Sequence, residues 1–305
     1  MVNKPRPFYF LGIIIALFPV CLTAQVNVNY KNAINKIKDD HTYIVGFSPI
    51  LSNKAAFLDI FQKYWTITKG ISFISPNDLP DRLDPADSYF VVTREIDGEA
   101  RGTEAVDASI GLWMPKNRVL RKHKTFSNST DNFIGSIVLT PNVHYTGRRV
   151  ADTVGANSIG YWSRGNLKNF LQEFSAAILL GKKVDVSDDI ADTSQLKSLK
   201  SQTLYCSPDV FYQSNSDGDK AKFVEEVFQQ YPYSYSVIST NELSAKILAD
   251  KEPFYYLIYL HNHVAGNVVA IMNSSTGQLI YSRTKSSFTD QIRPEYLKDI
   301  FKGIN

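Results

Sequence analysis

The sequence predicts an α/β protein made of two copies of one module, each copy a two-layer sandwich of helices packed on a mixed β-sheet. Three observations indicate this fold class. Residues 73–79 align without gaps on residues 237–243, with four identical residues. The elements around both segments recur in one order: strand, helix, strand, helix, strand, strand, strand, helix. The chain is also 44% hydrophobic and 12% aromatic, which is enough apolar material for one or two packed cores.

Each copy begins with a short strand and a helix. Residues 43–45 and residues 204–206 are strand-like, and a Ser-Pro pair follows each. The helix comes next, because apolar residues at the i, i+1, i+4 spacing lie on one helical face. They are Phe57, Leu58 and Phe61 in the first copy and Phe223, Val224, Val227 and Phe228 in the second.

The recurring segment leads into the next strand of each copy. Residues 88–92 parallel residues 254–258, and their aromatic and β-branched side chains are typical of a buried strand. Two more strands and a closing helix follow, at residues 109–114, 133–140 and 167–171 in the first copy and at residues 267–272, 278–283 and 297–301 in the second. A βαβ start followed by a strand meander predicts a mixed sheet.

The domain boundaries follow from this repeat. The first module spans residues 25–183 and carries long insertions, and the second spans residues 202–305. Residues 184–201 are rich in aspartate and lack aromatic residues, which predicts a linker. In element order, each module resembles the periplasmic modules of TolB amino-terminal domains and of curli-secretion lipoproteins. That resemblance implies a docking part of an envelope machine.

Residues 1–24 are typical of a secretory signal peptide. Lys4 and Arg6 precede an apolar run over residues 8–22, and Ala24 is a small residue suited to cleavage before Gln25. A retained membrane anchor is the alternative, but the run is short for a spanning helix. Lipidation at Cys21 is another, although the usual small residues do not surround it. The Thr-Ala-Gln ending is similar to that of many Bacteroidota signals, which places the protein in the periplasm or on the outer surface of a Gram-negative bacterium.

The mature chain is close to neutral, because residues 1–24 contain two of the 33 basic side chains and none of the 30 acidic ones. Net charge therefore gives no reason to expect nucleic acid as a partner. Only Cys206 remains after cleavage, so no disulfide can form within the mature chain. No later stretch reaches membrane-spanning length, and we expect no transmembrane segment in the mature protein.

No sequence motif establishes catalysis. His261 and His263 alternate along a strand and could share a metal ion, which makes a metal-assisted hydrolase one alternative. A third ligand at suitable spacing is missing, and an exposed polar turn also explains the pair. Ser163 is one residue away from a nucleophile elbow and is better explained as part of a helix start. No phosphate-binding glycine motif occurs, so we expect no resident cofactor.

Two insertions in the first module predict its contact surface. The first is basic and lacks acidic residues, which suits an acidic protein face, an anionic glycan or a lipid headgroup. Its cations are Lys116, Arg118, Arg121, Lys122 and Lys124. A solvated hairpin tip is the alternative explanation for this segment.

The second insertion, residues 140–162, is polar and aromatic and has no counterpart in the second module. Its candidate binding residues are His144, Tyr145, Arg148, Arg149, Tyr161 and Trp162. Trp113, Tyr145, Tyr161 and Trp162 could also stack on sugar rings, so a carbohydrate-binding protein is a further alternative. The leading hypothesis is an exported, non-enzymatic scaffold or adaptor of the bacterial cell envelope.

Overall fold

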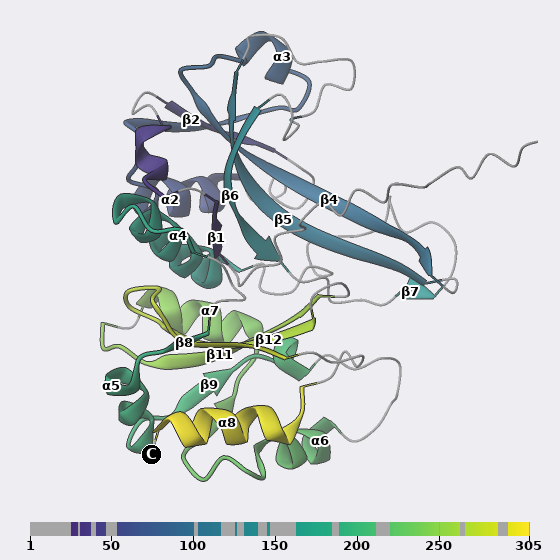
Figure 1. The fold of residues 1–305 in the computed structure, drawn as a ribbon, viewed down its shortest axis with the longest axis vertical. Coiled ribbons are helices and arrows are strands. Elements are labelled where there is room, and N and C mark those ends of the chain that lie inside the picture. Colours follow the sequence, from purple (N-terminus) through teal and green to yellow (C-terminus); the bar gives the residue numbers. More distant parts are fainter. Residues whose placement is uncertain are drawn as a thin grey trace, which may run out of the picture.

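The computed structural model describes residues 26–29, 31–37, 41–46, 54–100, 103–116, 126, 131–139, 145–146, 163–184, 189–211, 220–249, 251–262, 266–285 and 292–304. These residues form a mixed α/β protein with two halves, each built on its own sheet (Figure 1). Alternating apolar residues in the strands and one-sided apolar residues in the helices account for the elements.

The first sheet has the strand order β3-β2-β4-β5-β6-β1, with β7 pairing on β5. Strands β3, β2 and β4 are parallel, and the remaining pairs are antiparallel. The strands are β1 (Val26–Val28), β2 (His41–Val45), β3 (Gly70–Ile74), β4 (Ser88–Ala100), β5 (Thr103–Pro115), β6 (Asp131–Leu139) and β7 (Tyr145–Thr146). The helices are η1 (Ala33–Asn35), α2 (Lys54–Tyr64), α3 (Leu79–Arg82) and α4 (Arg164–Leu179).

The second sheet has the order β10-β9-β11-β12-β13-β8, again with three parallel strands followed by antiparallel ones. Its strands are β8 (Ile190–Ala191), β9 (Leu204–Cys206), β10 (Tyr235–Val237), β11 (Tyr255–Asn262), β12 (Gly266–Asn273) and β13 (Leu279–Lys285). Its helices are α5 (Thr193–Leu196), η3 (Lys197–Lys200), η4 (Pro208–Phe211), α6 (Lys220–Phe228), α7 (Thr240–Ala249) and α8 (Pro294–Ile304).

Helices cover both faces of each sheet. The predicted two-layer sandwich therefore accounts for only one of the two helical layers in each half. The crossover from β2 to β3 and the crossover from β3 to β4 run in opposite directions along the sheet. Because such crossovers are right-handed, their helices lie on opposite faces. Phe61 of α2 accordingly lies in one apolar cluster and Leu79 of α3 in another. In the second half, α6 and α8 pack on one face and α7 on the other.

Helix α4 lies between the two halves and packs against both α2 and α7 (Figure 1). Ser163 caps it by accepting a hydrogen bond from the Asn166 backbone at 3.2 Å. Lys168 is buried and donates to the Ile247 carbonyl at 2.9 Å and to the Ser274 carbonyl at 3.2 Å. One continuous apolar cluster therefore joins the inner face of the first sheet to the α7 face of the second.

The predicted linker at residues 184–201 contains secondary structure. Val184 bridges Val28, and β8 pairs with β13. The carboxylate of Asp192 caps α5 by accepting from the Ser194 and Gln195 backbone amides. Leu196 and Leu199 are fully buried in the second core. Residues 189–201 therefore pack with the second half, whereas Val184 pairs with the first, and Asp192 is a helix cap.

Candidate functional site

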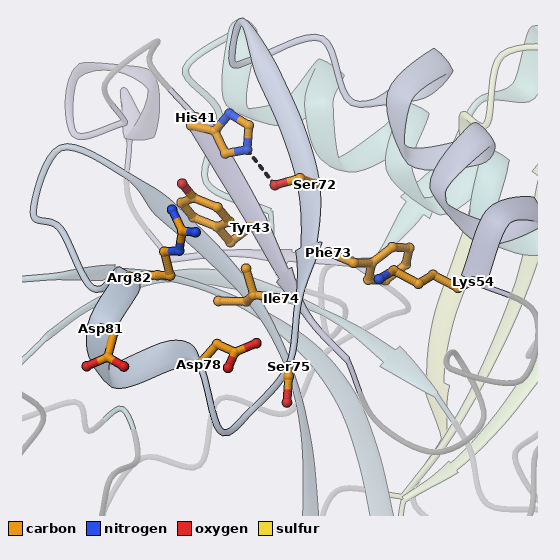
Figure 2. A pocket seen from close by; sticks show the side chains of 10 residues that line it. All are labelled: His41, Tyr43, Lys54, Ser72, Phe73, Ile74, Ser75, Asp78, Asp81 and Arg82. Atoms are coloured by element: carbon orange, nitrogen blue, oxygen red, sulfur yellow. Dashed lines mark hydrogen bonds between the residues drawn. The ribbon is translucent and has the colours of Figure 1, made fainter.

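A hollow among the described residues surrounds strand β3 at the edge of the first sheet. We call it the β3 hollow; its volume is about 730 Å³. Its lining comes from β2, β3, α3 and the start of α2 (Figure 2). The lining residues are His41, Tyr43, Lys54, Ser72, Phe73, Ile74, Ser75, Asp78, Asp81 and Arg82.

The topology explains why a hollow forms here. The chain leaves β2 toward α2 on one face of the sheet and leaves β3 toward α3 on the other face. Adjacent strands whose connections diverge in this way form a switch point, and ligands of open α/β sheets bind at the carboxyl ends of such strands. Ile74 and Ser75 at the carboxyl end of β3, together with Lys54 at the start of α2, occupy this place.

Half-buried aromatic side chains form one wall of the hollow. The Tyr43 ring lies 4.5 Å from the His41 ring and stacks on Tyr89 at 5.5 Å between centroids. His41 Nε2 and Ser72 Oγ are 2.8 Å apart and hydrogen-bonded. Gly70 permits this arrangement, because a Cβ atom at that position would overlap the His41 ring.

Tyr89 holds helix α3 beside this wall. Its hydroxyl donates to the Arg82 carbonyl at 2.6 Å and accepts from the Asp84 backbone amide at 2.8 Å. Burial raises the pKa of Tyr89, so the hydroxyl remains a donor at physiological pH. Arg82 and Asp81 are exposed at the rim and carry opposite charges.

The other wall lies on the opposite side of β3. Phe73 and Lys54 point away from Tyr43 and Arg82 in Figure 2. The Lys54 ammonium lies 5.6 Å from the centroid of the Phe73 ring, within range of a cation–π contact. The β3 hollow therefore wraps around an edge strand and is lined on both sides.

The arrangement suits binding better than catalysis. The His41–Ser72 pair has the atoms of a base and a nucleophile, but Ser72 lies within β3 and no carboxylate contacts the ring among the recorded contacts. Within the described residues, no group of three or more His, Cys, Asp or Glu side chains could hold a metal ion. Rim charges around an aromatic wall can instead fix the orientation of a bound partner.

The residues predicted from sequence lie elsewhere. Trp113 on β5 is only 8% exposed, and its ring stacks on Phe126 at 5.8 Å and contacts Phe133 at 4.6 Å. Its faces are already covered, so a role as a sugar platform would require Phe126 to leave. Lys116 is exposed directly after β5, and Tyr145 lies in β7, which pairs with β5.

Most other predicted residues lie outside the described part of the chain. These are Arg118, Arg121, Lys122, Lys124, His144, Arg148, Arg149, Tyr161, Trp162 and His263. The backbone of His261 is described, on β11 opposite Asn267. The structure therefore does not bring the predicted residues together into one site, and the metal and glycan alternatives stay predictions.

The sequence prediction missed the β3 hollow, although one signal for it was present. The recurring segment extends to Arg82 in the first half and Lys246 in the second, so both copies end their match on a cation. In the second half, Lys246 lies 4.9 Å from the Tyr205 ring centroid, and the corresponding residues of the first half, Arg82 and Tyr43, both line the β3 hollow. A cation recurring at the end of a repeated motif could have indicated this site.

Comparisons of the chain with family models, with curated proteins and with solved structures find no match. Among the described residues, no helix is long and apolar enough to span a membrane.

Proposed function

We propose that this protein is an exported, non-enzymatic binding or assembly component of the bacterial cell envelope, and that the β3 hollow is its contact site. The observation that carries this proposal is the difference between the two faces of the first sheet. The inner face is covered by α2 and α4 and, through α4, by the second half, whereas the β3 edge and the outer face beside it carry a hollow with a charged rim.

The proposal of export rests on the leader-like start of the sequence. Strand β1 begins at Val26, two residues after Ala24, and Val26 and Val28 are fully buried. Intact-mass measurement of the exported protein tests this part. A mass beginning at Gln25 is expected, and a mass that includes an acylated Cys21 would place the protein on a membrane instead.

We also infer that the two halves arose by duplication of one module. The identical strand orders support this, as does the position of the repeated motif at the β3–α3 and β10–α7 junctions. In this alignment Tyr43 corresponds to Tyr205. The register with β4 and β11 then makes Tyr89 correspond to Tyr256. The sequence alignment of residues 88–92 with residues 254–258 is therefore shifted by one residue. Such a shift would assign each side chain of the strand to the wrong face of the sheet.

Capture of envelope partners tests the binding role. A tagged protein would be cross-linked in cells, and its partners would be compared between wild type and a Lys54→Glu/Arg82→Glu double variant. A Lys298→Glu/Lys200→Glu variant is the matched control, since both lysines are exposed on the second half. We expect the partners to be lost only with the first variant. Equal recovery from all three proteins, or no specific partner at all, would reject the β3 hollow as the contact site.

A further inference from the structure

Strand β3 ends the first sheet and offers its backbone to another strand. It pairs with β2 on one side, and no described strand pairs with its other side. The Ile74 carbonyl accepts from the Gly46 amide at 3.0 Å, so the backbone groups of Ile74 point toward β2. In a parallel pair these directions alternate, so the amides and carbonyls of Ile71 and Phe73 point toward the open edge.

The two walls of the β3 hollow match the side chains of an added strand. Successive side chains of a strand point to opposite faces of the sheet. A segment lying beside β3 would therefore place one side chain against Lys54 and Phe73 and the next against Tyr43 and Ile74. All five residues of β3 are half-buried, and β3 is the last strand of the described sheet on this side.

The charges of the two walls define the chemistry of such a segment. Among the described lining residues, Lys54 is the only charged one beside Phe73, which favours an acidic side chain on that wall. On the other wall, the two carboxylates of Asp78 and Asp81 exceed the one cation, Arg82, which disfavours an acidic side chain, and the Tyr43 ring and Ile74 supply apolar surface. That wall favours an apolar side chain.

We propose that the β3 hollow binds an extended peptide segment of a partner protein by strand addition to β3, with acidic and apolar side chains alternating along the segment. Main-chain hydrogen bonds to Ile71 and Phe73 supply affinity, and the two walls supply selectivity. The inference rests on the proposed function and specifies the occupant of the same site.

The test uses the mature full-length protein and a defined probe, a fluorescent hexapeptide of alternating glutamate and valine. Two further versions carry N-methyl groups on all glutamates or on all valines. Strand addition uses every second amide, so one methylated peptide should lose about tenfold or more in affinity while the other binds nearly as well as the parent. A lysine–valine peptide should bind weakly to wild type and better to Lys54→Glu, whereas Lys298→Glu should behave as wild type.

Equal binding of the two methylated peptides, or no binding of any peptide, would overturn strand addition. So would self-association of the protein that the parent peptide fails to displace, because the edge would then belong to a second copy. If envelope partners are captured through Lys54 and Arg82 while the methylated peptides bind alike, the binding role stands and only strand addition fails.

Discussion

Glu173 is a titratable residue at the contact between the halves. It lies half-buried on α4, and its carboxylate accepts a hydrogen bond from the Leu279 backbone amide at the start of β13. Burial raises the pKa of Glu173 to about 7, while the Leu279 amide and Lys182 act in the opposite direction. The folded protein therefore favours the protonated carboxyl.

This pKa predicts a pH dependence of stability. Between pH 4.5 and about 7 the folded state holds more protons than the unfolded state, so the free energy of unfolding should fall as pH rises through that window. The loss should be on the order of 1 to 3 kcal/mol. Glu173→Gln should remove most of it in urea titrations at pH 5 and pH 8, and Glu252→Gln, on the exposed surface, should not. An unchanged slope in Glu173→Gln would assign the pH dependence to other groups.

Gly277 makes a second close contact between the halves. Its φ is +73°, and a Cβ there would overlap the Asn169 carbonyl of α4. Gly277→Ala should therefore lower the free energy of unfolding by about 1 to 3 kcal/mol. Gly303→Ala is the control, because its Cβ would meet only Leu196 at an ordinary 3.5 Å and a helical alanine is favoured. Similar stabilities of the two variants would show that the α4 contact adapts to the larger residue.

At the scale of elements, the β4–β5 ribbon distinguishes the first half from the second. In the duplication alignment, Glu95 and Asp107 correspond to Asn262 and Gly266, which flank a three-residue connection. The first half therefore has residues 96–106 where the second half has only residues 263–265. In Figure 1 the β4–β5 ribbon projects beyond the rest of the sheet.

Shortening this ribbon should leave the fold intact. Replacing residues 96–106 by residues 263–265 of the same chain removes the partners of β7 and the strand pairs beyond Glu95 and Asp107, and it keeps every pair that β5 makes with β6. The free energy of unfolding should change by less than about 1 kcal/mol. Ile110→Ala, in the same strand but 1% exposed, should lower it by about 2 to 4 kcal/mol. A comparable loss in the shortened protein would mean that the ribbon is part of the core.

The elements predicted from sequence were those that bury an apolar face. The pattern Phe57, Leu58 and Phe61 predicted α2, and the motif beginning at Phe73 predicted the β3–α3 junction. The outer ends of β4 and β5 were missed, because Arg94, Glu95 and Asp97 interrupt the apolar alternation from which strands are predicted. The β3 hollow was missed because apolar periodicity locates buried faces and does not indicate where a surface is concave.

At the scale of the whole molecule, the second half packs against the inner face of the first, which leaves the β3 edge and the outer face beside it for a partner. Tyr256 shows how closely the halves are joined: it accepts from Asn169 of α4 at 3.2 Å and is fully buried. Separating the halves would expose Tyr256 and would uncover Ile247 of α7, whose side chain lies against Gly165 of α4. The two halves should therefore unfold as one cooperative unit.

The unfolding of each half can be followed separately by a residue type that the chain already contains. All three tryptophans, Trp65, Trp113 and Trp162, precede residue 184 in the sequence, and Cys206 is the one cysteine of residues 25–305. Cys206 is fully buried in the second core, and burial raises the pKa of its thiol to about 12, so it should not react in the folded protein.

Equilibrium urea unfolding of the mature protein, followed in parallel by tryptophan fluorescence and by Cys206 labelling, tests the shared core most directly. We expect both probes to report one transition with the same midpoint. Labelling of Cys206 at urea concentrations where the tryptophan fluorescence is still native, or the reverse, would show that the halves fold independently, and the inner face of the first sheet could then become available to a partner as well.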